Sequence, residues 1–110
     1  MGQLGSIVAK PLLNDDGTCT LLASIYGLLS LNGDLREGDM IRNGKQIGTV
    51  CHRIVPELKM QVLEKRSLIY RGPKGEEGRI ISISGGYQGR KPRLVQSDSV
   101  LMVIELVKQS

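Results

Sequence analysis

The sequence predicts a small all-β protein, a flattened barrel of short strands, and three observations support this fold class. Turn dipeptides recur along the chain, because Asp16-Gly17, Gly38-Asp39 and Asn43-Gly44 each contain a residue that tolerates positive φ. The apolar runs between turns are short, and a glycine about every six residues from 33 to 50 disfavours a helix. The core must be aliphatic, since the chain has no Phe and no Trp. Short strands with glycine-rich corners are typical of a sheet that curls into a barrel.

The N-terminal part reads as a β-hairpin. Ser6 to Ala9 is a short apolar run and the first expected strand, and Pro11 is expected to end it. The sequence Asn14-Asp15-Asp16-Gly17 is a strong turn signal, so a second strand is expected over 18–24.

The next segment alternates apolar runs with glycine. Residues 25–31 are apolar around Gly27, which predicts a bend or bulge at a corner of the barrel. Gln46 to Val55 has only Gly48 as a breaker and is rich in β-branched residues, so it is expected to form a strand.

Residues 56–59 allow two interpretations. In the first they form the turn of a hairpin, and Met60 to Glu64 returns as a strand. In the second a proline occupies the first helical position, and Leu58, Val62 and Ile69 share a rough helical face. The hairpin is favoured because turn residues punctuate the rest of the chain so densely.

The C-terminal half alternates strands and long loops. Strands are expected at 68–70 and 79–84, with irregular loops at 71–78 and 85–92. Val100 to Val107 is the most apolar run of the chain. It is too continuous for an exposed strand, so we expect it deep in the barrel or against a partner.

Composition limits the class of protein. A chain of 110 residues is expected to form one domain, residues 1–110, and its formal net charge of +4 permits an acidic partner without requiring one. No run of 18 apolar residues exists to span a membrane, and the N-terminus lacks the basic and apolar regions of a signal peptide. We therefore expect a cytoplasmic protein in which Cys19 and Cys51 are reduced thiols.

Two halves of the chain look alike. Each half has a glycine, an apolar strand, a turn and a closing strand. The first half comprises Leu22–Leu29, Gly38–Ile41 and Gly44–Val50, and the second comprises Gly78–Ile83 and Val100–Glu105. This arrangement resembles the biotinyl/lipoyl-like domains. The resemblance implies a flattened barrel, the sandwich-barrel hybrid, with two quasi-symmetric halves.

The same resemblance implies a candidate attachment residue. Biotin-carrying members hold a lysine at a hairpin tip between the halves, in a Met-Lys-Met setting. Here Leu58-Lys59-Met60 lies between the halves, although the residue before Lys59 is Leu rather than Met. The resemblance therefore makes Lys59 a candidate carrier of biotin or lipoate; the alternative is an ordinary surface lysine.

A second resemblance concerns one segment only. Asp16-Gly17 followed by Leu22–Gly27 is similar to the opening barrel of RNA exosome cap subunits. Those proteins continue into an RNA-binding barrel that this chain lacks.

No motif points to catalysis or to a metal. Cys51 and His52 are adjacent, and neighbours on a strand point to opposite faces, so they cannot act as a nucleophile and its base. One histidine and two distant cysteines do not have the spacing of a zinc site. The chain is therefore not expected to be an enzyme.

The basic loops are the remaining candidates for binding. Arginine and lysine could hold phosphate, and one tyrosine could stack on a base. The alternative is a solvated loop in a mildly basic protein. The candidate nucleic-acid-binding residues are Arg71, Lys74, Arg79, Tyr87, Arg90, Lys91 and Arg93.

Three functions follow, in order of preference. The first is a non-enzymatic interaction or assembly module, which binds another protein or pairs the strand Val100–Val107 with a second copy of itself. The second is a nucleic-acid-binding accessory protein that uses loops 71–79 and 87–93. The third is a carrier domain that uses Lys59.

Overall fold

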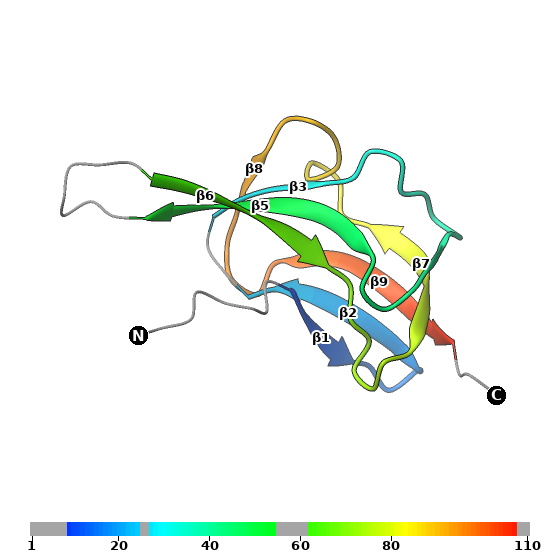
Figure 1. Cartoon of the computed structure of the whole chain (residues 1–110). Coiled ribbons are helices and arrows are strands. Elements are labelled where there is room, and N and C mark those ends of the chain that lie inside the picture. Colours follow the sequence, from blue (N-terminus) through cyan, green and yellow to red (C-terminus); the bar gives the residue numbers. More distant parts are fainter. Residues whose placement is uncertain (1–8, 25–26, 55–61, 108–110) are drawn as a thin grey trace.

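The aliphatic runs and glycine turns do form an all-β structure, which confirms the predicted fold class. The computed structural model describes residues 9–24, 27–54 and 62–107, and the regular structure in these ranges consists of strands. They form one antiparallel sheet in the order β1-β2-β9-β7-β4 and a second in the order β6-β5-β3-β8 (Figure 1). The strands are β1 (Ala9–Leu13), β2 (Thr18–Ala23), β3 (Gly27–Leu31), β4 (Met40–Ile41), β5 (Gln46–Ile54), β6 (Val62–Ile69), β7 (Glu77–Ile83), β8 (Arg93–Val95) and β9 (Val100–Val107).

One aliphatic core lies between the sheets. Leu21 and Ile104 enter it from the five-stranded sheet, and Leu29, Val50 and Leu68 enter it from the other. The alternation of buried and exposed positions along β3 follows from the two-residue period of a strand. Each fully buried aliphatic side chain contributes roughly 1.5–3 kcal/mol relative to an exposed one, so this shared core holds the two sheets together.

The first strand differs from the prediction. Pro11 lies inside β1 rather than ending it, while residues 6–8 lie outside the described ranges. Asn14 donates its backbone N–H to the Thr18 carbonyl oxygen at 2.9 Å. In an antiparallel pair every second residue is hydrogen-bonded to the neighbouring strand, so the backbone groups of residues 12 and 10 also point to β2. Residue 11 therefore faces the free edge, where the missing N–H of proline costs no ladder bond.

The hairpin interpretation of residues 46–70 is confirmed on either side of the turn. β5 and β6 pair antiparallel from Ile54↔Val62 onward, and the proposed turn at 56–59 lies outside the described residues. The helical alternative is wrong for Val62 and Ile69, which both belong to β6. Of the two strands expected at 60–64 and 68–70, residues 62–64 and 68–69 belong to this one strand, and residues 60–61 lie outside the described ranges.

The apolar C-terminal strand β9 is central, as its continuous apolar pattern predicts. It pairs with β2 on one side and with β7 on the other. The expectation that Val100–Val107 pairs with a second copy is therefore wrong, because both of its hydrogen-bonding edges are occupied.

Glycine marks the turns and one bulge. Gly38 and Gly44 have φ of 92° and 89°, as expected for their turn dipeptides. The register shifts of the described strands lie at Leu21/Leu22, Gln46/Gly48 and Ile80/Ser82. Gly27 itself pairs regularly with Val95, and residues 25–26 before it lie outside the described ranges. A Cβ on Gly48 would lie 2.5 Å from the Ser30 carbonyl oxygen, so this position requires the close approach that glycine allows.

Candidate interaction surfaces

The two basic loops lie at opposite ends of strand β7. One loop spans residues 71–76 and precedes β7, and the other spans 84–92 and follows it (Figure 1). A strand of seven residues is about 20 Å long, at about 3.3 Å per residue. The structure therefore does not bring the seven predicted residues together.

The loop after β7 is held against the loop at 32–37. Leu31 donates its backbone N–H to the Tyr87 carbonyl oxygen at 2.7 Å, and Gly89 donates to the Leu31 carbonyl oxygen at 3.0 Å. The Gln88 side-chain amide donates to the carbonyl oxygens of Leu35 at 2.6 Å and Asn32 at 3.0 Å. These bonds fix the centre of the loop in a single position relative to β3.

Beyond this anchor the loop presents three exposed basic side chains, those of Arg90, Lys91 and Arg93. No carboxylate of the described residues lies within ion-pair distance of them. Tyr87 is half-buried and packs against the core, so only part of its ring is accessible for stacking. The cluster can attract an anion, but the tyrosine beside it acts mainly as a packing residue.

The loop before β7 joins a turn that is distant in the sequence. Gly72 donates its backbone N–H to Asn43 Oδ1 at 2.9 Å, and Gly44 donates to the Tyr70 carbonyl oxygen at 2.8 Å. The exposed residues Arg71 and Lys74 therefore share one end of the molecule with the turn at 42–45. This turn adds two further exposed basic residues, Arg42 and Lys45, which sequence reasoning missed because only tertiary pairing brings the two segments together.

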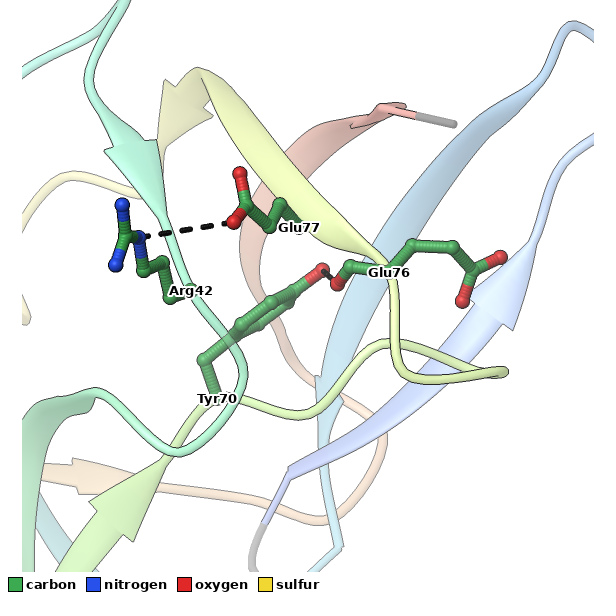
Figure 2. Close-up of polar contacts among 4 residues, drawn as sticks. All are labelled: Arg42, Tyr70, Glu76 and Glu77. Atoms are coloured by element: carbon green, nitrogen blue, oxygen red, sulfur yellow. Dashed lines mark hydrogen bonds and ion pairs between the residues drawn. The ribbon is translucent and has the colours of Figure 1, made fainter. Parts of the chain in front are cut away.

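Two glutamates limit the positive charge at this end. Arg42 Nε lies 3.6 Å from Glu77 Oε1, and Figure 2 shows the two side chains pointing toward each other. Glu76 Oε1 accepts a hydrogen bond of 2.5 Å from the Lys74 backbone N–H. Arg42 is paired, while Lys45, Arg71 and Lys74 have no ion-pair partner among the described residues.

A buried tyrosine holds the base of this loop. The Tyr70 hydroxyl donates to the Glu76 carbonyl oxygen at 3.1 Å (Figure 2), and the side chain is fully buried. Burial raises the pKa of Tyr70 to about 12, since a phenolate would lose its hydration there. The role of Tyr70 is therefore to fix the loop, not to transfer protons near neutral pH.

Arg79 belongs to neither loop cluster. It projects from β7 on the exposed face of the five-stranded sheet, and its Nη1 lies 3.4 Å from Glu105 Oε1 on β9. Both side chains are about half exposed, and such a surface pair stabilises a fold only weakly, by roughly 0–1 kcal/mol.

The outer face of the four-stranded sheet carries a continuous apolar row. Leu28 lies directly opposite Leu94 on one side and Cys51 on the other. Leu28 and Leu94 are 37% and 53% exposed, and the free thiol of Cys51 is half-buried. We call these three residues the Leu28 row. It continues to the exposed Lys65, which lies opposite Cys51 on β6.

The five-stranded sheet also exposes apolar side chains, those of Leu12, Leu13, Met40, Ile81 and Val100. Met40 lies opposite Arg79 and Leu12 lies opposite Thr20, so each of these two has a polar neighbour on the next strand. Single exposed apolar residues are normal on protein surfaces, whereas in the Leu28 row apolar side chains lie next to each other across three adjacent strands.

The remaining sequence candidates are not assembled into a site. Lys59 lies outside the described residues, and of His52 the structure describes the backbone position in β5. Cys19 is fully buried, and burial raises the pKa of its thiol, which keeps it unreactive. No group of three potential metal ligands occurs among the residues that the structure describes.

The fold and its surfaces define a two-sheet all-β protein with exposed rows and loop tips. The described strands and turns include no helix long and apolar enough to cross a membrane. Comparison with known protein families, characterised proteins and solved structures finds no match to this chain.

Proposed function

We propose that this chain is a non-enzymatic interaction module. The observation that supports the proposal best is the Leu28 row, because three neighbouring strands place Leu94, Leu28 and Cys51 side by side on an outer face. Covering exposed apolar surface is favourable by roughly 25 cal/mol per Å². The separation of the two basic loops favours the same function over a single nucleic-acid face.

A double variant tests the row. Leu28→Thr with Leu94→Thr removes the two exposed leucines of the row and introduces β-branched residues, which are suited to a strand. The control is Leu12→Thr with Ile81→Thr, which also replaces two exposed apolar residues by Thr, but on the other sheet. Sedimentation velocity over a range of concentrations measures self-association, and quantitative capture from lysate of the native cell measures binding to other proteins.

We expect the row variant to weaken the association at least tenfold and the control variant to leave it unchanged. A wild-type chain that stays strictly monomeric and captures no protein would contradict the proposal. If both double variants lost association equally, the Leu28 row would not be the interaction surface.

The second candidate function is nucleic-acid binding, and one observation favours it. The contact between the turn at 42–45 and the loop at 71–75 gathers Lys45, Arg71 and Lys74 at one end of the molecule. Several lysines and arginines acting together give binding that weakens steeply with salt.

A salt titration with single-stranded RNA and with duplex DNA tests this candidate. Arg71→Gln with Lys74→Gln removes two charges at one end, and Arg90→Gln with Lys91→Gln removes two at the other. If nucleic acid is the ligand, one pair of substitutions reduces the salt dependence and the other does not. Absence of any affinity at about 50 mM salt would end the hypothesis.

The carrier hypothesis for Lys59 remains a prediction. The confirmed pairing of β5 with β6 agrees with a hairpin that carries the lysine between its strands. The intact mass of the chain from its native cell tests it. A mass increase equal to biotin or lipoate that is lost in Lys59→Arg would support the carrier, and an unmodified mass would exclude it.

A further inference from the structure

Three of the four sheet edges are unsuited to pairing with another strand. β4 has two residues and β8 has three, with Pro92 immediately before it. β1 is longer, but Pro11 faces its free edge and offers no N–H there. Short edges and proline are the usual means of preventing strand addition.

The fourth edge, β6, is eight residues long and contains no proline. Asn32 donates its backbone N–H to the Ile47 carbonyl oxygen. Because hydrogen-bonded residues alternate along an antiparallel pair, the backbone groups of residues 47, 49 and 51 of β5 point to β3. The alternate residues of β5 bond to β6, where Val50 lies opposite Arg66. The N–H and C=O groups of Lys65 and Ser67 therefore point to the free edge.

Beyond Cys51, the described residues place no third strand beside the β5–β6 hairpin. Among the described residues β3 pairs with β5 from Gly48 to Cys51, whereas β5 pairs with β6 as far as Ile54↔Val62. Figure 1 shows the two strands extending together beyond the end of β3. A two-stranded ribbon in water is marginally stable alone, and a strand added along β6 would make it three-stranded.

A second copy of the chain is a poor occupant of this edge. If β6 of one copy paired antiparallel with β6 of another, the free N–H groups of each strand would have to face the free C=O groups of the other. Two registers satisfy this condition and use nearly the whole strand. One register places Lys65 opposite Lys65 of the other copy, with Glu64 opposite Arg66 on either side of that pair, and the other register places Arg66 opposite Arg66. Like charges directly opposite each other destabilise a strand pair. The described side chains that share the face of Lys65 are those of Ser67 and Ile69, neither of which is acidic.

We propose that β6 binds an extended acidic segment of another protein as an additional strand. The proposal rests on the function proposed above and specifies the class of partner. Backbone bonds from Lys65 and Ser67 hold the added strand. An acidic side chain on the outer face of the added strand lies opposite Lys65, beyond the Leu28 row, and pairs with it.

The test uses a fluorescein-labelled heptapeptide, Thr-Val-Glu-Val-Glu-Val-Thr, whose two Glu side chains share one face of a strand. The matched peptide carries Lys in place of both Glu. We expect fluorescence anisotropy to show binding of the acidic peptide at least tenfold tighter than binding of the basic peptide. We also expect amide hydrogen exchange at Lys65 and Ser67 to slow in the complex, because their N–H groups become bonded.

Two variants separate backbone pairing from charge. Ser67→Pro removes one N–H from the free edge and leaves the β5 ladder intact, as Pro11 does in β1, and Ser67→Ala is its control. We expect Ser67→Pro to weaken binding of the acidic peptide at least tenfold.

We expect Lys65→Glu to reverse the preference, so that the variant binds the basic peptide more tightly than the acidic one. Lys91→Glu makes the same change of net charge at the loop cluster and should leave binding unchanged. If Ser67→Pro does not fold, the exchange of preference in Lys65→Glu decides the question.

Three outcomes would overturn the inference. The first is no binding of the acidic peptide, and the second is that Lys91→Glu weakens its binding as much as Lys65→Glu does. The third is a wild-type dimer that Ser67→Pro dissociates. Failure here is distinguishable from failure of the proposed function. If the Leu28 and Leu94 variant loses association while the β6 variants do not, the chain remains an interaction module and only the β6 edge is excluded.

Discussion

Gly78 occupies a position in the core where there is no room for a side chain. It begins the buried stretch of β7, where a Cβ would collide with Ile104 Cγ2 and lie 2.9 Å from the Tyr70 hydroxyl. Because both neighbours are fully buried, neither can move away without disturbing the core.

We therefore expect Gly78→Ala to lower the free energy of unfolding by about 1–3 kcal/mol, the usual cost of overpacking a core. Urea unfolding measures this change. Gly85→Ala is the control, since a Cβ there meets nothing within 4 Å, and it should shift stability by less than about 0.5 kcal/mol. Equal effects at both positions would show that chain entropy, not collision, is responsible.

Tyr70 predicts a specific dependence of stability on pH. Its pKa is about 12 in the folded chain and has the ordinary value of 10.0 when exposed. The raised pKa means that the folded state binds the proton more tightly, so the contribution to stability is complete below pH 10. It is lost as the pH rises from 10 toward about 12.

Urea unfolding at about pH 9 and about pH 11 should show a larger loss of stability in the wild type than in Tyr70→Phe. The same pH dependence in both proteins would contradict the assignment. At neutral pH the variant should be less stable by about 1 kcal/mol, because the Glu76 carbonyl oxygen loses its donor.

At the scale of elements, the loop anchor is the clearest determinant of surface shape. One side chain, Gln88, bridges the loop after β7 to the loop after β3 through two carbonyl oxygens. Without it, two carbonyl oxygens lose a donor and the basic residues at 90–93 lose their fixed position.

We expect Gln88→Ala to reduce stability by about 1–2 kcal/mol and to speed hydrogen exchange at the Gly89 amide. Gln96→Ala is the control, because Gln96 is exposed and its side chain makes no hydrogen bond within the described residues. An unchanged exchange rate at Gly89 would show that the backbone bonds alone hold the loop.

The sequence located most strands but not their ends. Strand 18–24 and the turns at 38–39 and 43–44 were predictable, because glycine conformation and two-residue alternation are local properties. The prediction that Pro11 ends the first strand is wrong, because a strand can contain proline where the missing N–H would face a free edge. Which side of β1 is free depends on the order of strands in the sheet.

At the scale of the whole molecule, both sheets share one core. Its members come from β2, β7 and β9 on one side and from β3, β5 and β6 on the other. Neither sheet can expose its inner face without exposing that of the other, so the sheets should unfold together.

Urea unfolding followed by far-ultraviolet circular dichroism and by tyrosine fluorescence should therefore give coincident single transitions. The dichroism spectrum should be that of a β protein. Two separate transitions would show that the sheets are independent units.

The sequence by itself determined the all-β class, the aliphatic core and the turn positions, because allowed φ angles and side-chain alternation belong to each residue and its neighbours. Only the tertiary structure decided that β9 is central, that β6 is a free edge, and that Lys45 lies near Arg71. The physical reason is that backbone hydrogen bonds between strands are chemically alike, so the choice of neighbour depends on how the whole set of strands buries its apolar faces.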